Sequence, residues 1–242
     1  MSNSRSDFVG PILLAIFAYL ASMLTRAFQR SIEQTAISNA AQRVANLNYT
    51  ITDKFIADET LLERLQDAKI WEDCDLAGPK WWNGKTKPKN IWEELSEKIW
   101  EERSEFDIAA GFEYWCNILS DGESLPWHID KDEVEFEKSN NLMLPLKGAV
   151  YFGLDHQFDK GGGHFYLIDA DNRHNPNEFD TARRDEIVAI ASGFNRLIHF
   201  NASKWHRVSA VKGGKRYTFA VNANSHKPKL LTKHGIKAQE IQ

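Results

Sequence analysis

Three side chains in the second half of the chain have the types and spacing of metal ligands. His128 and Asp130 are separated by a single residue, so in an extended strand they project from the same face. His206 supplies a second imidazole much further along the chain. Two imidazoles and one carboxylate form the facial ligand set that holds Fe(II) and leaves three coordination positions open. The sequence therefore predicts a metal site at His128, Asp130 and His206.

A fourth residue, Arg216, follows in the run Gly213-Gly214-Lys215-Arg216-Tyr217-Thr218. Its planar guanidinium can donate two parallel hydrogen bonds to one carboxylate. An anion-binding side chain beside an open metal site predicts a dicarboxylate co-substrate. One end of such a molecule would chelate the metal, and the other would bind Arg216.

The chain around Gly213-Gly214 predicts a β-hairpin whose strands carry His206 and Arg216. A two-residue turn would point Arg216 away from His206. A three-residue loop beginning at Lys212 instead pairs Arg216 with Ala210, on the face of His206. Ala210 and His206 are then roughly 13 Å apart at about 3.3 Å per residue, which leaves room for a metal ion and a five-carbon diacid. Because glycine adopts the left-handed conformation that such loops require, we expect the three-residue loop.

Five short runs carry a family resemblance: Asn117-x-Leu119-x-x-Gly122, Leu125-Pro126-Trp127-His128-Ile129-Asp130, Asn195-Arg196-Leu197-Ile198-His199-Phe200, Trp205-His206-Arg207-Val208 and Gly214-Lys215-Arg216-Tyr217-Thr218. The chain over residues 110–222 resembles the 2-oxoglutarate and Fe(II)-dependent dioxygenases, most closely their prolyl-4-hydroxylase-like branch. By this resemblance, His128, Asp130 and His206 hold Fe(II), Arg216 binds the far carboxylate of 2-oxoglutarate, and Thr218 is its hydroxyl partner.

One position departs from the family pattern, because many members have a tyrosine where this chain has Leu119. Tyr114 or Tyr151 is the candidate for a phenol that contacts 2-oxoglutarate instead. The resemblance implies that O2 is the oxidant and that a C–H bond is hydroxylated while succinate and CO2 are released. It suggests a peptidyl, prolyl-type side chain as the target, with a small molecule as the alternative.

Three other interpretations use the same residues. A jelly-roll binding module would keep the fold without turnover, and a cupin-like metal hydrolase or isomerase would use the three ligands but leave Arg216 without a role. In the third, His128 and His206 are packed core histidines and Arg216 is a surface charge. The combination of three ligands with Arg216 favours the dioxygenase.

The predicted fold is mainly β, with a double-stranded β-helix (jelly roll) core braced by N-terminal α-helices. Residues 55–68 and 90–103 predict amphipathic helices. Beyond Phe106, short β-rich runs alternate with turns rich in aspartate and glycine, notably at 159–163. The predicted strands are 112–119, 127–130, 142–146, 149–154, 164–168, 187–191, 197–200, 207–211 and 216–221.

Two segments have alternative interpretations. The polar residues 171–184 form either a loop over the mouth of the barrel or a surface insertion. Five tryptophans that precede the strands form either a substrate-facing wall or, as we favour, part of the core and lid packing: Trp71, Trp81, Trp82, Trp92 and Trp100.

Charge and cysteine content limit the classes of binding partner and the covalent cross-links that the chain can have. A formal net charge of −4 and a pI near 6.1 argue against nucleic acid as a partner, because nonspecific binding relies on a cationic surface. Cys74 and Cys116 are the two cysteines and provide no disulfide framework. Cys116 lies in an apolar run, which predicts a packed thiol.

Residues 8–25 contain no charge and are apolar around a whole helical circumference. At about 1.5 Å per residue they would span roughly 27 Å, enough to cross a hydrocarbon core as a single-pass anchor. A buried helix and a signal peptide are the alternatives. Arg26 and Arg30 beyond the segment favour a cytoplasmic catalytic domain, and without an anchor the protein would be cytoplasmic. We expect an N-terminal hydrophobic helix and helical stalk over 1–48 and a dioxygenase domain over 49–242.

Overall fold

The computed structural model describes residues 24–25, 28–29, 47–154, 162–170 and 173–229. The chain divides into two units, residues 1–43 and 44–242. In the first unit the described residues are helical: Leu24, Thr25, Phe28 and Gln29. Most of the predicted anchor at 8–25 lies outside the described residues, and no helix within them has the length and apolar character to cross a membrane. The anchor and the domain boundary at residue 48 stay predictions.

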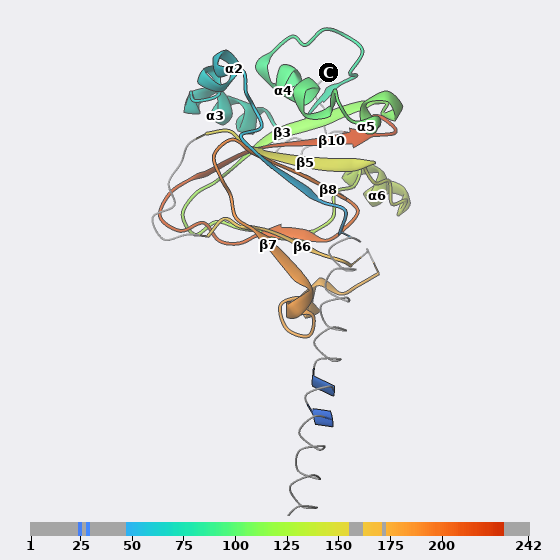
Figure 1. Ribbon diagram of the computed structural model, residues 1–242. Coiled ribbons are helices and arrows are strands. Elements are labelled where there is room, and N and C mark those ends of the chain that lie inside the picture. Colours follow the sequence, from blue (N-terminus) through green and yellow to red (C-terminus); the bar gives the residue numbers. More distant parts are fainter. Residues whose placement is uncertain (1–23, 26–27, 30–46, 155–161, 171–172, 230–242) are drawn as a thin grey trace, which may run out of the picture. The chain divides into compact units, whose positions relative to one another are not determined.

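Two antiparallel sheets make up most of the second unit (Figure 1). The larger sheet has the strand order β1-β8-β5-β10-β3-β2, and the smaller has the order β4-β9-β6-β7. The strands are β1 (Thr50–Asp53), β2 (Lys80–Trp82), β3 (Gly111–Leu119), β4 (Leu125–His128), β5 (Lys147–Phe152), β6 (Phe165–Ile168), β7 (Ile187–Ile190), β8 (Arg196–Phe200), β9 (His206–Val208) and β10 (Arg216–Asn224).

From β3 to β10 the chain changes sheet at every step except the β6–β7 pair. This alternation is the winding of a double-stranded β-helix, and it confirms the predicted fold class. The short strands β1 and β2, which lie at the two edges of the larger sheet, were not predicted. The predicted strand at 142–146 is not formed, and this segment leads into β5 instead.

The predicted hairpin between His206 and Arg216 is wrong. Strand β9 pairs with β4 and β6 in the smaller sheet, whereas β10 pairs with β3 and β5 in the larger one. The segment between them crosses from one sheet to the other, with Val211 bridging to Asp121 and Gly162. Both edges of each strand are already hydrogen-bonded to strands from earlier in the chain, so β9 and β10 cannot pair with each other.

In the described part of the chain, four α-helices cover the outer face of the larger sheet, and a fifth follows β4 (Figure 1). The predicted helix at 90–103 is α4, which begins after Asn90, whose side chain accepts hydrogen bonds from Trp92 N and Glu93 N. The predicted helix at 55–68 is shorter in the structure, where α2 begins after Asp58 and ends at Arg64, and a separate helix, α3, begins after Asp67. The helices are α2 (Glu59–Arg64), α3 (Ala68–Ala77), α4 (Ile91–Trp100), α5 (Ser104–Ile108) and α6 (Glu133–Ser139).

An aromatic core joins the helices to the larger sheet. Four of the five tryptophans are buried in it: Trp71, Trp82, Trp92 and Trp100. Trp92 stacks on Phe219 of β10 with a ring-centroid distance of 5.2 Å. These rings therefore pack the core and do not line a substrate wall. Cys74 and Cys116 are free, buried thiols in the same cluster.

Side chains of β10 point alternately to this core and to the space between the sheets. Tyr217, Phe219 and Val221 belong to the aromatic core. Arg216 and Thr218 point to the opposite side, into a pocket that the smaller sheet closes. A second apolar cluster, which includes Phe152, Phe165, Ile198 and Phe200, fills the rest of the space between the sheets.

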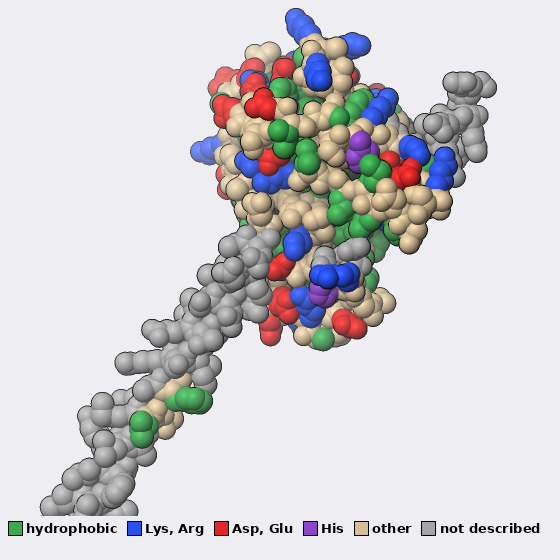
Figure 2. All heavy atoms as spheres, turned by 90° about the vertical axis from the view of Figure 1, so that its right-hand side faces the viewer, with side chains coloured by type: hydrophobic (Ala, Val, Ile, Leu, Met, Phe, Trp, Pro, Cys, Tyr) green, Lys and Arg blue, Asp and Glu red, His purple; other side chains and the backbone are tan. Residues whose placement is uncertain are grey.

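The described surface carries charges of both signs. On the face shown in Figure 2, Lys and Arg side chains are interspersed with Asp and Glu side chains. Several of these charges are paired, for example Lys98 with Glu101 at 2.9 Å and Arg64 with Glu94 at 2.9 Å. Exposed pairs of this kind contribute little to stability.

Candidate metal centre

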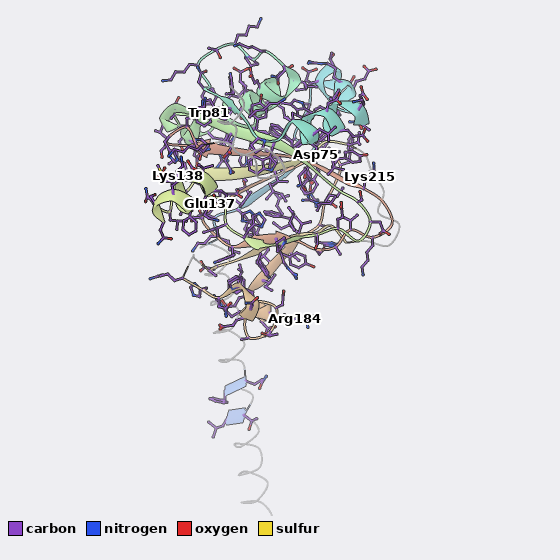
Figure 3. All side chains as sticks on the ribbon, turned by 180° about the vertical axis from the view of Figure 1, so that it is seen from behind. Asp75, Trp81, Glu137, Lys138, Arg184 and Lys215 are labelled. Carbon is purple, nitrogen blue, oxygen red and sulfur yellow. The ribbon has the colours of Figure 1, made fainter. Side chains whose placement is uncertain are left out.

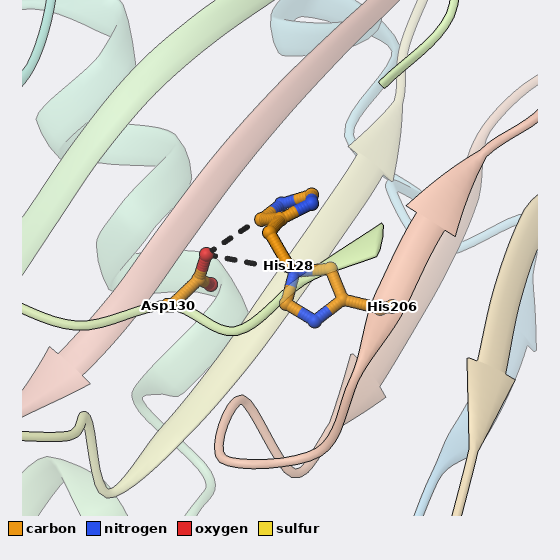
Figure 4. Close-up of side chains that lie close together, drawn as sticks. All are labelled: His128, Asp130 and His206. Atoms are coloured by element: carbon orange, nitrogen blue, oxygen red, sulfur yellow. Dashed lines mark ion pairs between the residues drawn. The ribbon is translucent and has the colours of Figure 1, made fainter. Parts of the chain in front are cut away.

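The three predicted metal ligands converge on one point between the sheets (Figure 4). His128 is the last residue of β4, and it pairs across the sheet with His206, the first residue of β9. The two imidazole rings are therefore neighbours, with centroids 4.2 Å apart. Asp130 Oδ1 lies 3.5 Å from His206 Nε2 and 4.0 Å from His128 Nε2. The strand register thus brings together residues that are far apart in sequence.

Backbone carbonyls orient both rings. His128 Nδ1 lies 2.7 Å from the carbonyl oxygen of Pro126, and His206 Nδ1 lies 2.9 Å from that of Lys204. A carbonyl only accepts hydrogen bonds, so each Nδ1 carries the proton and each Nε2 keeps a lone pair. Both Nε2 atoms face Asp130. This arrangement is typical of imidazoles that ligate a metal through Nε2.

The protonation states also suit a divalent cation. Burial and the neighbouring His206 ring lower the pKa of His128 to about 4. Burial alone would raise the pKa of Asp130, but the two imidazoles and the Asn222 amide bring it down to about 2. At neutral pH the site therefore presents a carboxylate and a neutral His128 ring, and metal binding there requires no loss of a proton from either group.

Asn222 on β10 is a site residue that sequence reasoning missed. Its Nδ2 donates a hydrogen bond to Asp130 Oδ2 at 3.1 Å, and its side chain is buried. The bond leaves Oδ1 directed at the two histidines. A signal was available, because Asn222 follows Arg216 and Thr218 at even spacing on the same strand face.

Arg216 is buried at the other end of the same pocket, with 2% of its surface exposed. Its Nε donates to Gly163 O at 3.0 Å, its Nη1 donates to Thr218 Oγ1 at 3.0 Å, and its guanidinium lies 5.1 Å from the centre of the Phe152 ring. No carboxylate among the described residues pairs with it. Burial lowers the pKa of Arg216 to about 9. A buried cation without a counter-ion is costly, which indicates an anionic ligand.

One pocket holds both ends of the site. Its lining includes the three candidate metal ligands, Arg216 and Thr218, and from β3 the residues Trp115 and Asn117. The Oδ1 atom of Asn117 is buried and has no hydrogen-bond partner. A buried amide oxygen without a partner marks a place where a bound molecule or water donates. The sequence pattern included Asn117 in a motif but assigned it no role.

The structure does not bring Tyr114 or Tyr151 to the pocket, contrary to the expectation from sequence. Tyr114 lies in the aromatic core beside Phe219. The hydroxyl group of Tyr151 donates to Asn195 Oδ1 at 3.1 Å, on the helix-covered side of the sheet. Side chains alternate along a strand, and both tyrosines occupy positions that face the helices. The described lining of the pocket contains no phenol.

The described part of the polar segment 171–184 packs against the strands that carry the histidines. Phe179 is fully buried against Trp127 and Trp205. Asp180 accepts a hydrogen bond from Trp127 Nε1 at 3.2 Å and pairs with Arg207 at 2.9 Å. Trp127 and Arg207 are the chain neighbours of His128 and His206. The segment therefore packs against both strands on the side opposite the candidate metal ligands.

Comparison with known proteins shows similarity in fold only. No protein-family model and no curated protein matches the chain. The chain is similar to a prolyl-4-hydroxylase from Pseudomonas putida, with 13% identity over 76% of this chain and 90% of that one and a TM-score of 0.49. A prolyl hydroxylase from Trichoplax adhaerens, solved with a hypoxia-inducible factor peptide, shows 12% identity over 82% and 93% with a TM-score of 0.49. HygX from Streptomyces hygroscopicus, solved with nickel and 2-oxoglutarate, shows 12% identity over 78% and 85% with a TM-score of 0.49.

Proposed function

We propose that this protein is an Fe(II)- and 2-oxoglutarate-dependent dioxygenase that hydroxylates a C–H bond. The observation that carries the proposal is one pocket with three metal-binding atoms within 4.8 Å of one another at one end and an unpaired, buried guanidinium at the other. Two imidazoles and one carboxylate suit Fe(II) with open positions. A dicarboxylate that chelates the metal would place its far carboxylate at Arg216.

Each residue of the pocket has a role in this proposal. His128, Asp130 and His206 would hold Fe(II), and Arg216 with Thr218 would bind the far carboxylate of 2-oxoglutarate. When bound, the iron supplies activation of O2 with 2-oxoglutarate as the electron donor, which leaves as succinate and CO2.

The chain itself lines the pocket with apolar rings and orients the Arg216 guanidinium. Phe165 and Phe200 contact the His206 ring with centroid distances of 5.6 and 4.9 Å, and both line the pocket. Apolar rings at this place exclude water and limit side reactions. The carbonyl of Gly163 and the hydroxyl of Thr218 hold the guanidinium in one orientation before the co-substrate arrives.

The buried guanidinium also argues against the alternatives. A cupin-like hydrolase or isomerase needs the metal ligands but not Arg216. A binding module without turnover would need no pair of Nε2 lone pairs directed at one carboxylate. The proposed target is a peptidyl, prolyl-type side chain, with a small molecule as the alternative, and this rests on the sequence resemblance.

The test is iron-dependent succinate formation. The purified protein is supplied with Fe(II) and 2-oxoglutarate without O2, and succinate is measured by mass spectrometry after O2 is admitted. We expect succinate only when iron and O2 are both present, and none from His206→Ala. His174→Ala, at an exposed histidine, is the matched control and should retain activity. Tight binding of metal and 2-oxoglutarate with no succinate under any condition would favour the binding module.

A further inference from the structure

A second hollow adjoins the metal centre on the side away from Arg216. It shares Trp115, His128, Asp130 and Asn222 with the first pocket. Its other walls come from the residue before β2, from β3, from the segment between β4 and α6 with the first residue of α6, and from the last described residues of the chain: Pro79, Glu113, Ile129, Lys131, Asp132, Glu133, Pro228 and Lys229. A substrate that enters here would meet the metal-binding residues directly.

Most charged groups in this hollow already have partners. Lys131 pairs with Glu133 at 2.7 Å, and Lys229 pairs with Glu135. The carboxylate of Asp132 accepts hydrogen bonds from the backbone N–H groups of Glu135 at 2.9 Å and Lys229 at 3.0 Å. These groups form the wall of the hollow and are not free to bind a ligand without losing a contact.

Glu113 is different, because no described residue donates a hydrogen bond to its carboxyl group or forms an ion pair with it. It lies on β3 opposite Asn222, the residue that holds Asp130. Burial, together with Asp130 and Asp132, raises the pKa of Glu113 to about 8, and a cation bound beside the carboxyl group would favour loss of its proton. A partly buried carboxyl group without a partner indicates that a bound molecule supplies one.

Trp115 stands two residues from Glu113 on the same face of the strand and lines both pockets. It lies outside the buried core clusters. The face of an indole ring attracts cations, and this attraction strengthens as water is excluded. An unpaired carboxyl group beside an indole is the combination expected for recognition of a positively charged group.

We propose that Glu113 and Trp115 bind an ammonium or guanidinium group of the substrate and so hold a neighbouring C–H bond at the metal centre. This inference rests on the proposed dioxygenase function, since the hollow ends at His128 and Asp130. It narrows the target to molecules that carry a basic group, either peptides with lysine or arginine or free amines.

Binding is tested without turnover, so that it can be separated from catalysis. The protein is loaded with Mn(II) and 2-oxoglutarate in the absence of O2 and titrated with defined probes by calorimetry. The probes are capped tripeptides with a central lysine or arginine, their norleucine and citrulline counterparts, and spermidine. We expect at least one basic probe to bind ten-fold or more tightly than the neutral peptides. Tighter binding of a basic peptide than of spermidine would indicate a peptide substrate, and the reverse would indicate a free amine.

Variants identify the residues responsible. Glu113→Gln, which keeps the shape of the side chain, should weaken the basic probe ten-fold or more, and Trp115→Leu should do so more than Trp115→Phe. Glu137→Gln on α6 is the matched control (Figure 3), because Glu137 is exposed and outside the hollow. Titration with 2-oxoglutarate alone should be the same for Glu113→Gln and the unaltered protein, which shows that the variant is folded.

The inference is overturned if no basic probe binds, if the neutral peptides bind equally well, or if Glu113→Gln binds the basic probe as tightly as the unaltered protein. A failure of the dioxygenase proposal looks different. In that case succinate is not formed with iron and O2, whatever the binding titrations show.

Discussion

Asn222 Nδ2 donates a hydrogen bond to Asp130 Oδ2 at 3.1 Å, and this contact joins the larger sheet to the segment that follows β4 in the smaller one. The carboxylate of Asp130, a proposed metal ligand, is therefore oriented by a strand of the opposite sheet. The same strand, β10, carries Arg216 and Thr218 at its start. One strand thus positions both the proposed metal end and the proposed dicarboxylate end of the pocket.

Replacement of Asn222 should weaken metal binding. Without the amide, the Asp130 carboxylate can rotate, and we expect Asn222→Ala to lower Mn(II) affinity about 10- to 100-fold, the range typical of residues that orient metal ligands. Calorimetric titration with Mn(II) measures the change. Asn224→Ala, at a buried position on the same strand that makes no contact with Asp130, is the control. Equal Mn(II) affinities of the two variants would contradict an orienting role.

Replacement of Arg216 should separate co-substrate binding from metal binding. With Mn(II) present, 2-oxoglutarate should raise the Tm of the unaltered protein, because a ligand that binds only the folded state stabilises it. Arg216→Met should abolish this rise while Mn(II) still binds. Without ligands the variant should be no less stable than the unaltered protein, since it no longer buries an unpaired cation.

The neighbouring Lys215 provides the control for this experiment. It is exposed and labelled in Figure 3, and Lys215→Met should leave the 2-oxoglutarate effect on Tm unchanged. Persistence of the full effect in Arg216→Met would exclude Arg216 as the dicarboxylate-binding residue.

Two glycines allow a comparison of backbone strain with steric clash. Gly122 and Gly162 both have left-handed backbone, with φ of 82° and 95°. A Cβ at Gly122 would meet nothing within 4 Å, whereas at Gly162 it would lie 2.2 Å from the carbonyl oxygen of Ala210. Gly122→Ala should cost about 1–2 kcal/mol of unfolding free energy from the backbone conformation alone.

Gly162→Ala should cost roughly 1–3 kcal/mol more, because the crossing segment between β9 and β10 must shift. Urea denaturation measures both variants. Since the next residue, Gly163, accepts the hydrogen bond from Arg216 Nε, Gly162→Ala should also weaken 2-oxoglutarate binding. Equal costs for the two variants would show that the Ala210 contact relaxes freely.

His199 should make the protein sensitive to acid. It is buried against Trp100, with Nε2 3.2 Å from Ile99 O, and burial followed by Arg103 lowers its pKa from 6.5 to about 4. Between these two pH values the unfolded chain binds a proton that the folded protein does not. The free energy of unfolding is therefore highest above pH 6.5 and falls as the pH drops towards 4, by at most about 3 kcal/mol from this group.

His199→Gln can keep the hydrogen bond to Ile99 O without titrating, so it isolates this contribution. Urea denaturation of metal-free protein from pH 7 to 4 should show a smaller loss of stability for the variant. His128 also titrates in this range, but its contribution is present in both proteins and cancels in the difference. Parallel pH profiles would show that His199 does not bind a proton on unfolding.

The sequence by itself determined the chemistry that this protein offers. Two imidazoles, a carboxylate and a guanidinium are readable as residue types, and short β-rich runs after leading helices predict the double-stranded β-helix. These features are local, and their physical causes act over a few residues. The helix starts were not predicted, since the sequence favoured one helix over 55–68 where Asp67 caps the start of a second one.

Only the tertiary structure decided which strands pair and which side chains come together between the sheets. The predicted hairpin between His206 and Arg216 followed from local sequence features, but both strands pair with strands from earlier in the chain instead. His206 and Arg216 therefore lie on different sheets and line one pocket between them. Tyr114 and Tyr151 point to the helices, Asn222 contacts Asp130, and Glu113 lines the adjoining hollow. Alternation along a strand decides these orientations only once the register with distant strands is set. Register is a long-range property, and one sequence does not contain it in readable form.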